Sequence, residues 1–294
     1  MGKVLRFGVW SLMFLIGCSE KQPTEQQLAD HNKDVEVWYA KRIEDLKGHD
    51  GWLNLAGLFW LNDGINSFGS DPANDIVFPS GKIAAEAGYF FVKGQQVTMT
   101  PGPGMDLKET IIFHPDSTRA ITVEHNSLEW FVIRRDGKLG IRLRDMESEN
   151  IRSFQGIGRY PVDYSWRIKA RFEPPIDDET IEITNVLGQT TAIPLAGTCV
   201  FEVDGKEQRL AATSEGDKLF VVFGDATNGK ETYGAGRFIY LDRPDSTGVV
   251  IDFNKSYNPP CAFTEFATCP LPPKQNVLSI SIPAGEKNYE HHGK

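Results

Sequence analysis

Short runs of apolar residues, separated by turn residues, make up most of the chain beyond Gly51. Apolar and polar positions alternate within runs such as RIKARFE, TIEITNV and GVVIDF, which is the period of a half-buried β-strand. Bends at Lys93-Gly94, Asp136-Gly137 and Asp204-Gly205 predict β-hairpins. Most gaps between the runs are too short for parallel crossovers, which need about a dozen residues or more. The pattern therefore predicts an all-β protein with antiparallel sheets.

One segment before these strands has helical spacing instead. Its apolar residues lie largely three or four positions apart, and they are Val35, Trp38, Tyr39, Ile43 and Leu46. Gly48 ends the pattern. The preceding residues 19–34 are polar and include a proline, which is typical of a flexible tether. We predict a tether over residues 18–34 and a helix over residues 35–48.

The N-terminus has the arrangement of a secretory signal. Lys3 and Arg6 precede a mainly apolar run that ends at Leu15-Ile16-Gly17-Cys18. The run is too short to span a hydrocarbon layer of about 30 Å, which disfavours the alternative of a membrane-spanning helix. The segment resembles the signals of bacterial lipoproteins. That resemblance implies a signal peptide over residues 1–17 and a lipid on Cys18, which anchors the chain to a membrane. Ser19 resembles the pattern for sorting to the periplasmic face of the outer membrane, so we expect a location in the cell envelope.

Length and composition set the scale of the folded part. The chain has 294 residues, of which 40% are hydrophobic and 24% charged, enough for one large or two medium domains. SFQGIGRY interrupts the strands, so we predict β domains over residues 49–153 and 154–288, followed by a tail over residues 289–294. The formal charge of -9 and the absence of a long basic run argue against nucleic acid as a partner.

The first β domain contains INSFGSDPANDIVFPSGKIAAEAGYFFVKGQQVTM, which resembles a forkhead-associated β-sandwich. Domains of that family bind phosphothreonine through an arginine that follows a glycine, and through a serine and a histidine before the next strand. Here Ser70 follows Gly69, and the later positions read Ala84 to Gly88. Without a guanidinium group there is no bidentate grip on phosphate. The resemblance therefore implies a structural use of the sandwich.

Four longer stretches carry a wider resemblance. They are GWLNLAGLFWLNDGINSFGSDPANDIVFP, RDMESENIRSFQGIGRYPVDYSWRIKARFEP, FVVFGDATNGKETYGAGRFIYLD and DFNKSYNPPCAFTEFATCPLPP. Together they resemble the bacterial domain-of-unknown-function family 1684, over about Trp38 to Lys287. The family implies no established activity, so the candidate chemistry must come from the residues.

Three cysteines remain after Cys18, namely Cys199, Cys261 and Cys269. Cys261 and Cys269 lie in a proline-rich loop, and in an oxidising envelope we predict a structural disulfide between them. Two alternatives are a metal site, which lacks a nearby histidine, and a nucleophilic Cys261, which lacks an adjacent base. Cys199 is expected to be a buried small residue. We predict neither a metal nor a cofactor.

Polar residues gather where strands of the second β domain end. Asp225 follows LFVVFG, Asp252 and Asn254 close VVIDF, and four more residues lie close by in the sequence: Tyr233, Arg237, Tyr257 and Asn258. Such a set could bind a small polar or anionic ligand, or it could only bond turn amides and form a buried ion pair. We predict a binding or envelope-assembly role with this pocket, and identify no protein partner. The alternative is a hydrolase that uses Asp225 and Asp252 with Arg237, or the thiol of Cys261.

Overall fold

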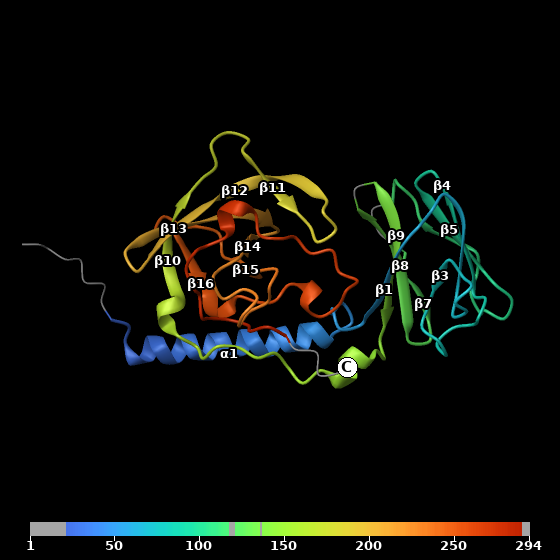
Figure 1. Cartoon of the computed structure of the whole chain (residues 1–294), viewed down its shortest axis with the longest axis horizontal. Helices are drawn as coiled ribbons and strands as arrows, with labels where there is room; N and C mark the ends of the chain where they lie inside the picture. Colours follow the sequence, from blue (N-terminus) through green and yellow to red (C-terminus); the bar gives the residue numbers. More distant parts are fainter. Residues whose placement is uncertain (1–21, 118–120, 136, 290–294) are drawn as a thin grey trace, which may run out of the picture.

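The computed structural model describes residues 22–117, 121–135 and 137–289. The predicted signal peptide and Cys18 lie outside the described residues, and so does most of the predicted tail. The helix α1 (Glu25–Lys47) runs along the C-terminal β domain, and the N-terminal sandwich lies beyond the C-terminal end of this helix (Figure 1). The described chain is mostly β, with antiparallel pairing in all but one strand pair, which confirms the predicted fold class.

Helix α1 begins at Glu25, well before the predicted start at residue 35. Thr24 and Gln27 form a capping box, in which the Thr24 hydroxyl accepts from the Gln27 amide and Gln27 Oε1 accepts from the Thr24 amide. This motif was overlooked, so the predicted tether over residues 25–34 is wrong. The buried residues of helix α1 are His31, Val35 and Leu46. Within the described chain, no helix has the length and apolarity that crossing a membrane requires.

Two sheets form the N-terminal sandwich. The first has the order β1-β9-β8-β7, with β1 (Leu55–Trp60), β9 (Lys138–Asp145), β8 (Leu128–Arg135) and β7 (Val123–His125). The second has the order β3-β2-β4-β5-β6, with β3 (Ile76–Val77), β2 (Gly64–Gly69), β4 (Gly88–Lys93), β5 (Gln96–Pro101) and β6 (Thr110–Phe113). Ser70 donates its hydroxyl to the carbonyl of Ile83, a bond within the fold. The likeness to forkhead-associated domains stays a prediction.

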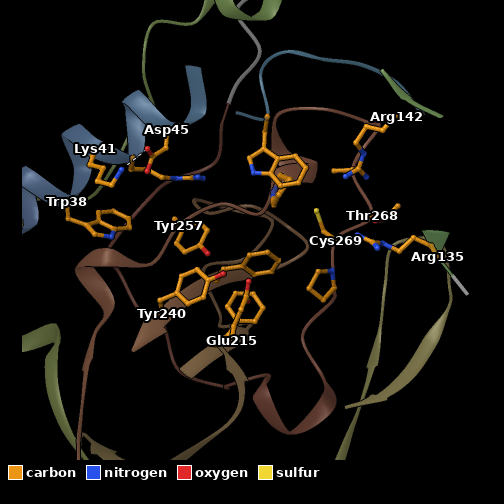
Figure 2. A pocket seen from close by; sticks show the side chains of 17 residues that line it. Trp38, Lys41, Asp45, Arg135, Arg142, Glu215, Tyr240, Tyr257, Thr268 and Cys269 are labelled. Atoms are coloured by element: carbon orange, nitrogen blue, oxygen red, sulfur yellow. Dashed lines mark hydrogen bonds and ion pairs between the residues drawn. The ribbon is translucent and has the colours of Figure 1, made fainter. Parts of the chain in front are cut away.

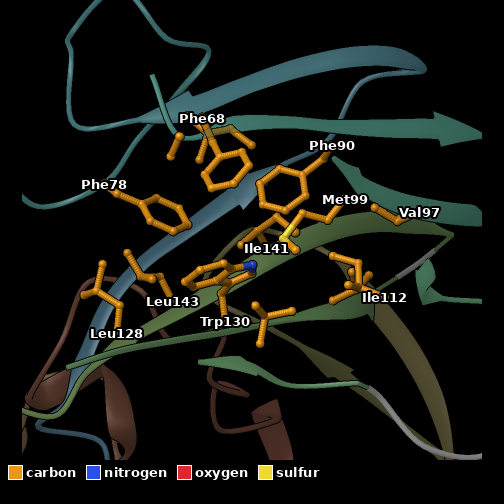
Figure 3. Close-up of a cluster of buried hydrophobic side chains, with 14 of the residues drawn as sticks. Phe68, Phe78, Phe90, Val97, Met99, Ile112, Leu128, Trp130, Ile141 and Leu143 are labelled. Carbon is orange, nitrogen blue, oxygen red and sulfur yellow. The ribbon is translucent and has the colours of Figure 1, made fainter. Parts of the chain in front are cut away.

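Aromatic rings fill the space between these two sheets (Figure 3). Phe68 stacks on Phe90 with ring centres 4.4 Å apart, and Phe78 meets Trp130 edge-on at 5.4 Å. Strand β9 sends Leu139, Ile141 and Leu143 into this core. Since side chains alternate along a strand, Arg142 and Arg144 lie on its other face, away from this core.

A short connection joins the two β domains. It contains helix α2 (Glu149–Ser153), which the Ser148 hydroxyl caps, and the 3-10 turn η1 (Tyr164–Trp166). The side chain of Tyr39 on α1 bonds the backbone of Ile157 in this connection. These bonds attach α1 to the segment that joins the two domains.

The C-terminal domain is built on one sheet with the order β15-β14-β13-β12-β10-β16, and β11 also pairs with β12. Its strands are β10 (Arg167–Glu173), β11 (Thr180–Thr184), β12 (Thr190–Val203), β13 (Lys206–Glu215), β14 (Lys218–Phe223), β15 (Arg237–Leu241) and β16 (Val249–Asp252). The 3-10 turns η2 (Phe253–Lys255), η3 (Pro260–Ala262) and η4 (Lys274–Asn276) follow. Since β15 and β16 contact each other, the sheet is nearly closed into a barrel.

Each strand from β11 to β14 pairs with the next strand along the chain, as the predicted meander requires, but β10 skips β11 and pairs with β12 and β16. Strand β12 is long enough to pair with β11 along its first half and with β10 along its second half. The register shifts between Leu195 and Gly197, where Gly197 has a φ of +148°. A Cβ at Gly197 would lie 2.3 Å from the Phe172 ring, so this bend requires glycine.

Candidate ligand-binding site

Asp225 and Arg237 form an ion pair inside the C-terminal barrel. Arg237 Nη2 donates to Asp225 Oδ2 at 2.6 Å, and both side chains are completely buried. The same guanidinium donates to the carbonyls of Ile282 and Ala284, and Asp225 accepts from Thr227. The two residues are therefore parts of the folded core. This corrects the prediction that they line the mouth of a ligand pocket or perform acid-base chemistry.

Asp252 and Asn254, at the end of β16, form hydrogen bonds with helix α1 and with the segment before η1. His31 Nε2 on α1 lies 2.8 Å from Asp252 Oδ2, and Asn254 donates to the other carboxylate oxygen. Asn254 also binds the backbone of Asp163. Asp225 and Asp252 thus belong to separate networks, and the predicted acid pair is not assembled. His31 was missed because it lies in the segment that was predicted to be a tether.

Of the remaining predicted residues, Tyr233 and Asn258 form hydrogen bonds within the fold, and Tyr257 lines a cavity. Tyr233 donates to the carbonyl of Cys261, and the fully buried Asn258 donates to Glu286 and to the carbonyl of Lys287. Tyr257 is the one predicted ligand-binding residue that lines a large cavity. The site that the structure presents is therefore built mainly from residues that the sequence did not single out.

This cavity, of about 640 Å³, lies between α1, the C-terminal barrel and the sandwich (Figure 2). Lys41 and Asp45 on α1 lie at one side, and Arg135 and Arg142 lie at the opposite side. The volume is within the range of about 300 to 1,000 Å³ that small-molecule sites occupy.

Six of the residues that line the cavity are aromatic, and they are Trp38, Trp52, Phe220, Phe238, Tyr240 and Tyr257. Phe238 and Tyr240 are two positions apart on β15, while the intervening Ile239 points into the barrel core. Tyr240 pairs across the strands with Phe220, at 5.0 Å between ring centres, and stacks on Tyr257 at 6.2 Å. The outer face of β14 and β15 is therefore a continuous aromatic surface.

The tyrosines of this wall are neutral hydrogen-bonding groups. Burial raises the pKa of Tyr257 well above its ordinary value. Burial, followed by a hydrogen bond with Glu215, raises the pKa of Tyr240 to about 12. Both phenols consequently keep their protons at physiological pH, and these protons are engaged in the hydrogen bonds that join Tyr257, Tyr240 and Glu215.

The loop from Pro260 to Pro270 forms a further side of the cavity. In the structure Cys261 and Cys269 are joined by a disulfide, with Cα atoms 6.1 Å apart. In this state Cys261 has no free thiol, so the structure does not support the predicted alternative of a nucleophilic Cys261. The proline-rich stretch is therefore a loop closed by a disulfide at the edge of the cavity, and we call it the rim loop.

Two basic residues of the cavity have partners within the chain. Lys41 pairs with Asp45 at 2.8 Å. Arg42 pairs with the buried Glu286 at 3.1 Å, donates to the carbonyl of Asn258, and lies 4.6 Å from the ring centre of Tyr257. The positive charges of Lys41 and Arg42 are therefore neutralised by acidic side chains of the chain itself.

Arg142 on β9 is different. It is 7% exposed, and its buried Nε has no hydrogen-bond partner among the described residues. Its guanidinium carbon lies 6.0 Å from the ring centre of Trp52, and burial lowers its pKa to about 10. A buried donor without an acceptor costs about 1 to 3 kcal/mol. Sequence reasoning missed Arg142 as a candidate binding residue, because an arginine on the outward face of a strand is ordinarily solvated.

Comparisons with known proteins place the chain as follows. A metallo-beta-lactamase type 2 of Pseudomonas aeruginosa is 29% identical over 90 residues, which span 27% of this chain and only 37% of that relative's length. In the described ranges no three His, Cys, Asp or Glu side chains are grouped to hold a metal. An uncharacterized protein of Haloarcula marismortui, solved by solution NMR, is 30% identical; the match covers 49% of this chain and 82% of that one, with a TM-score of 0.41. The model of the family "Protein of unknown function (DUF1684)" matches residues 152–287, and this part of the chain, which includes the C-terminal β domain, belongs to that family.

Proposed function

We propose that this protein binds a small amphipathic organic molecule in the cavity between α1, the C-terminal barrel and the sandwich. The observation that carries this proposal is the aromatic wall of Phe220, Phe238, Tyr240 and Tyr257 around a space of about 640 Å³. Aromatic rings supply apolar contact area, and the tyrosine hydroxyl oxygens can accept hydrogen bonds that orient a ligand.

The geometry supports binding better than hydrolysis. The residues that line this cavity include no histidine and no serine, and the sulfur of Cys269 is part of the disulfide. The acids predicted for a hydrolase, Asp225 and Asp252, are held in networks away from the cavity. A general base beside a nucleophile is what such a reaction needs. The cavity offers shape, apolar surface and charge instead.

The N-terminal sequence supports a place for this function in the cell envelope. A lipid on Cys18 would anchor the protein to a membrane, as the signal-like residues before it imply. Helix α1, which begins shortly after Cys18, forms one wall of the cavity through Trp38 and Arg42. The proposal is therefore a lipid-anchored binding protein whose ligand site lies next to its anchoring helix.

A thermal-shift screen of small aromatic and aliphatic compounds tests the binding function. Compounds that raise the melting temperature are titrated against Tyr240→Ala and against Tyr89→Ala, a matched tyrosine on the distant sheet of the sandwich. Tyr240 is 43% exposed and Tyr89 is 37% exposed, so neither change empties the core. We expect Kd to rise about tenfold or more for Tyr240→Ala alone. Absence of any stabilising compound, or equal effects of both variants, would contradict the proposal.

A further inference from the structure

We propose that the ligand is a small organic acid, whose anionic group binds Arg142 with help from Arg135 at the sandwich side of the cavity. This inference rests on the proposed function, and it adds the chemical class of the ligand. It is independent of the ion pair of Arg237 and Asp225, which is closed within the barrel.

The charges around the cavity are unevenly compensated. Four basic residues line it, namely Lys41, Arg42, Arg135 and Arg142. Two acids line it as well: Asp45 pairs with Lys41, and Glu215 accepts a hydrogen bond from Tyr240. Lys41 and Arg42 have acidic partners, whereas neither arginine at the sandwich side has one among the described residues. Arg135 donates only to the carbonyl of Arg134. The uncompensated positive charge is therefore concentrated at one end of the cavity, opposite α1 (Figure 2).

Burial separates Arg142 from an ordinary surface cation. With 7% of its surface exposed, its guanidinium cannot be fully hydrated. Its register partners on both neighbouring strands, Leu58 on β1 and Phe131 on β8, are apolar and supply no acceptor. Trp52 contacts the guanidinium through its ring face. The described surroundings hold Arg142 in place but leave its donors free for a molecule in the cavity.

The chemistry of the free donors selects the ligand. A guanidinium presents a planar fork that matches the two oxygens of a carboxylate, and it stays charged at physiological pH. The aromatic wall beside it accepts an aromatic or aliphatic body. A neutral apolar compound would fill the wall but leave Arg142 unpaired. An organic acid satisfies both parts of the cavity.

Isothermal titration calorimetry with two matched probes tests this inference. The probes are 2-naphthoate and 2-naphthamide, which share one ring system and differ in charge. The wild-type chain is compared with Arg142→Gln, and Arg134→Gln serves as the control because Arg134 is exposed and does not line the cavity. We expect the wild type to bind the carboxylate about tenfold tighter than the amide, as charge-assisted hydrogen bonds imply.

In Arg142→Gln we expect this preference to fall to about twofold or less, while the amide affinity is kept and Arg134→Gln behaves as the wild type. If Arg142→Gln does not fold, Arg135→Gln, a change at an exposed residue, must still reduce the preference. Equal binding of the two probes, or a preference that survives the cavity variants, overturns the anion site and leaves the cavity a binding site. Absence of binding by both probes overturns the cavity as a binding site and the anion site with it.

Discussion

Arg142 and Arg144 are neighbours on the same face of β9, yet their hydrogen bonding is opposite. Arg144 Nη1 donates to the carbonyl of Gly51 at 2.6 Å and to Asn54 Oδ1 at 2.5 Å. Arg142 has a buried Nε without a partner and lines the large cavity. Arg144 thus joins the segment before β1 to β9, whereas Arg142 faces the cavity.

This difference predicts opposite effects on stability. Arg144→Met removes a donor from two buried acceptors and should lower the free energy of unfolding by about 2 to 3 kcal/mol. Arg142→Met removes a charge that burial disfavours, so the free energy of unfolding should stay within about 1 kcal/mol of the wild type or rise. Urea denaturation at neutral pH measures both values. Equal destabilisation by the two changes would show that Arg142 has a structural partner.

The core ion pair gives a second prediction. Arg237→Met leaves the carboxylate of Asp225 buried without its cation, which should cost about 3 to 5 kcal/mol of unfolding free energy. The control is Arg243→Met, because Arg243 is exposed and bonds only Ser214 and the carbonyl of Gly216. Chemical denaturation compares the two variants. A loss at Arg237 no larger than at Arg243 would return Arg237 to the candidates for a ligand site.

The rim loop gives a third prediction. The Cys261–Cys269 bridge spans a sequence separation of 8 residues, and closing a loop of this size is worth roughly 2 to 3 kcal/mol in the chain-entropy model. Changing both cysteines to alanine should lower stability by about that amount and weaken binding of cavity ligands. Peptide mapping without reductant should find the two cysteines linked. Cys199 should resist alkylation in the folded protein, because burial raises the pKa of its thiol to about 12.

A free and reactive Cys261 in the native protein would contradict this account. It would make a thiol-based activity the leading alternative, as the sequence alone allowed. Alkylation of the native chain, followed by denaturation and a second alkylation with a different mass label, distinguishes the two outcomes at each cysteine.

Alkaline titration gives a fourth prediction. Burial raises the pKa of six tyrosines above the ordinary value of 10.0, and they are Tyr39, Tyr160, Tyr233, Tyr240, Tyr257 and Tyr289. Because the folded pKa exceeds the unfolded one, their contribution to stability is complete below about pH 10 and is lost as the pH rises toward about 12. Tyrosinate absorbance should therefore lag behind a free-tyrosine curve until the fold is lost. Titration of all tyrosines near pH 10 in a folded protein would contradict these burials.

The membrane anchor gives a fifth prediction. If the residues before Cys18 form a lipoprotein signal, labelled palmitate should be incorporated into the wild-type chain in a bacterial host but not into Cys18→Ser. Membrane fractionation should follow the same pattern. Incorporation that is unchanged in Cys18→Ser would exclude a lipid at this residue.

Local pattern was sufficient for much of the fold. Alternation of side chains predicted the β class, and the turn at Asp204-Gly205 indeed joins β12 to β13. The start of α1 was missed although Thr24 and Gln27 have the spacing of a capping box, so that signal was present in the sequence.

The candidate site could not be read in the same way, because burial there depends on distant segments. Arg237 appeared at a strand end beside polar residues, but the carbonyls of Ile282 and Ala284 close over it in the fold. Arg142 lies on a strand face where an arginine is ordinarily solvated, yet in the fold it is buried beside Trp52. A local sequence pattern cannot predict which face of a strand a second domain will cover.

A crystal structure of the protein with 2-naphthoate is the decisive test of the anion site at Arg142. We expect the carboxylate within hydrogen-bond distance of the Arg142 guanidinium, and the naphthalene ring against the wall of Tyr240 and Tyr257. A naphthoate bound elsewhere, or a carboxylate of the chain itself paired with Arg142, would contradict it.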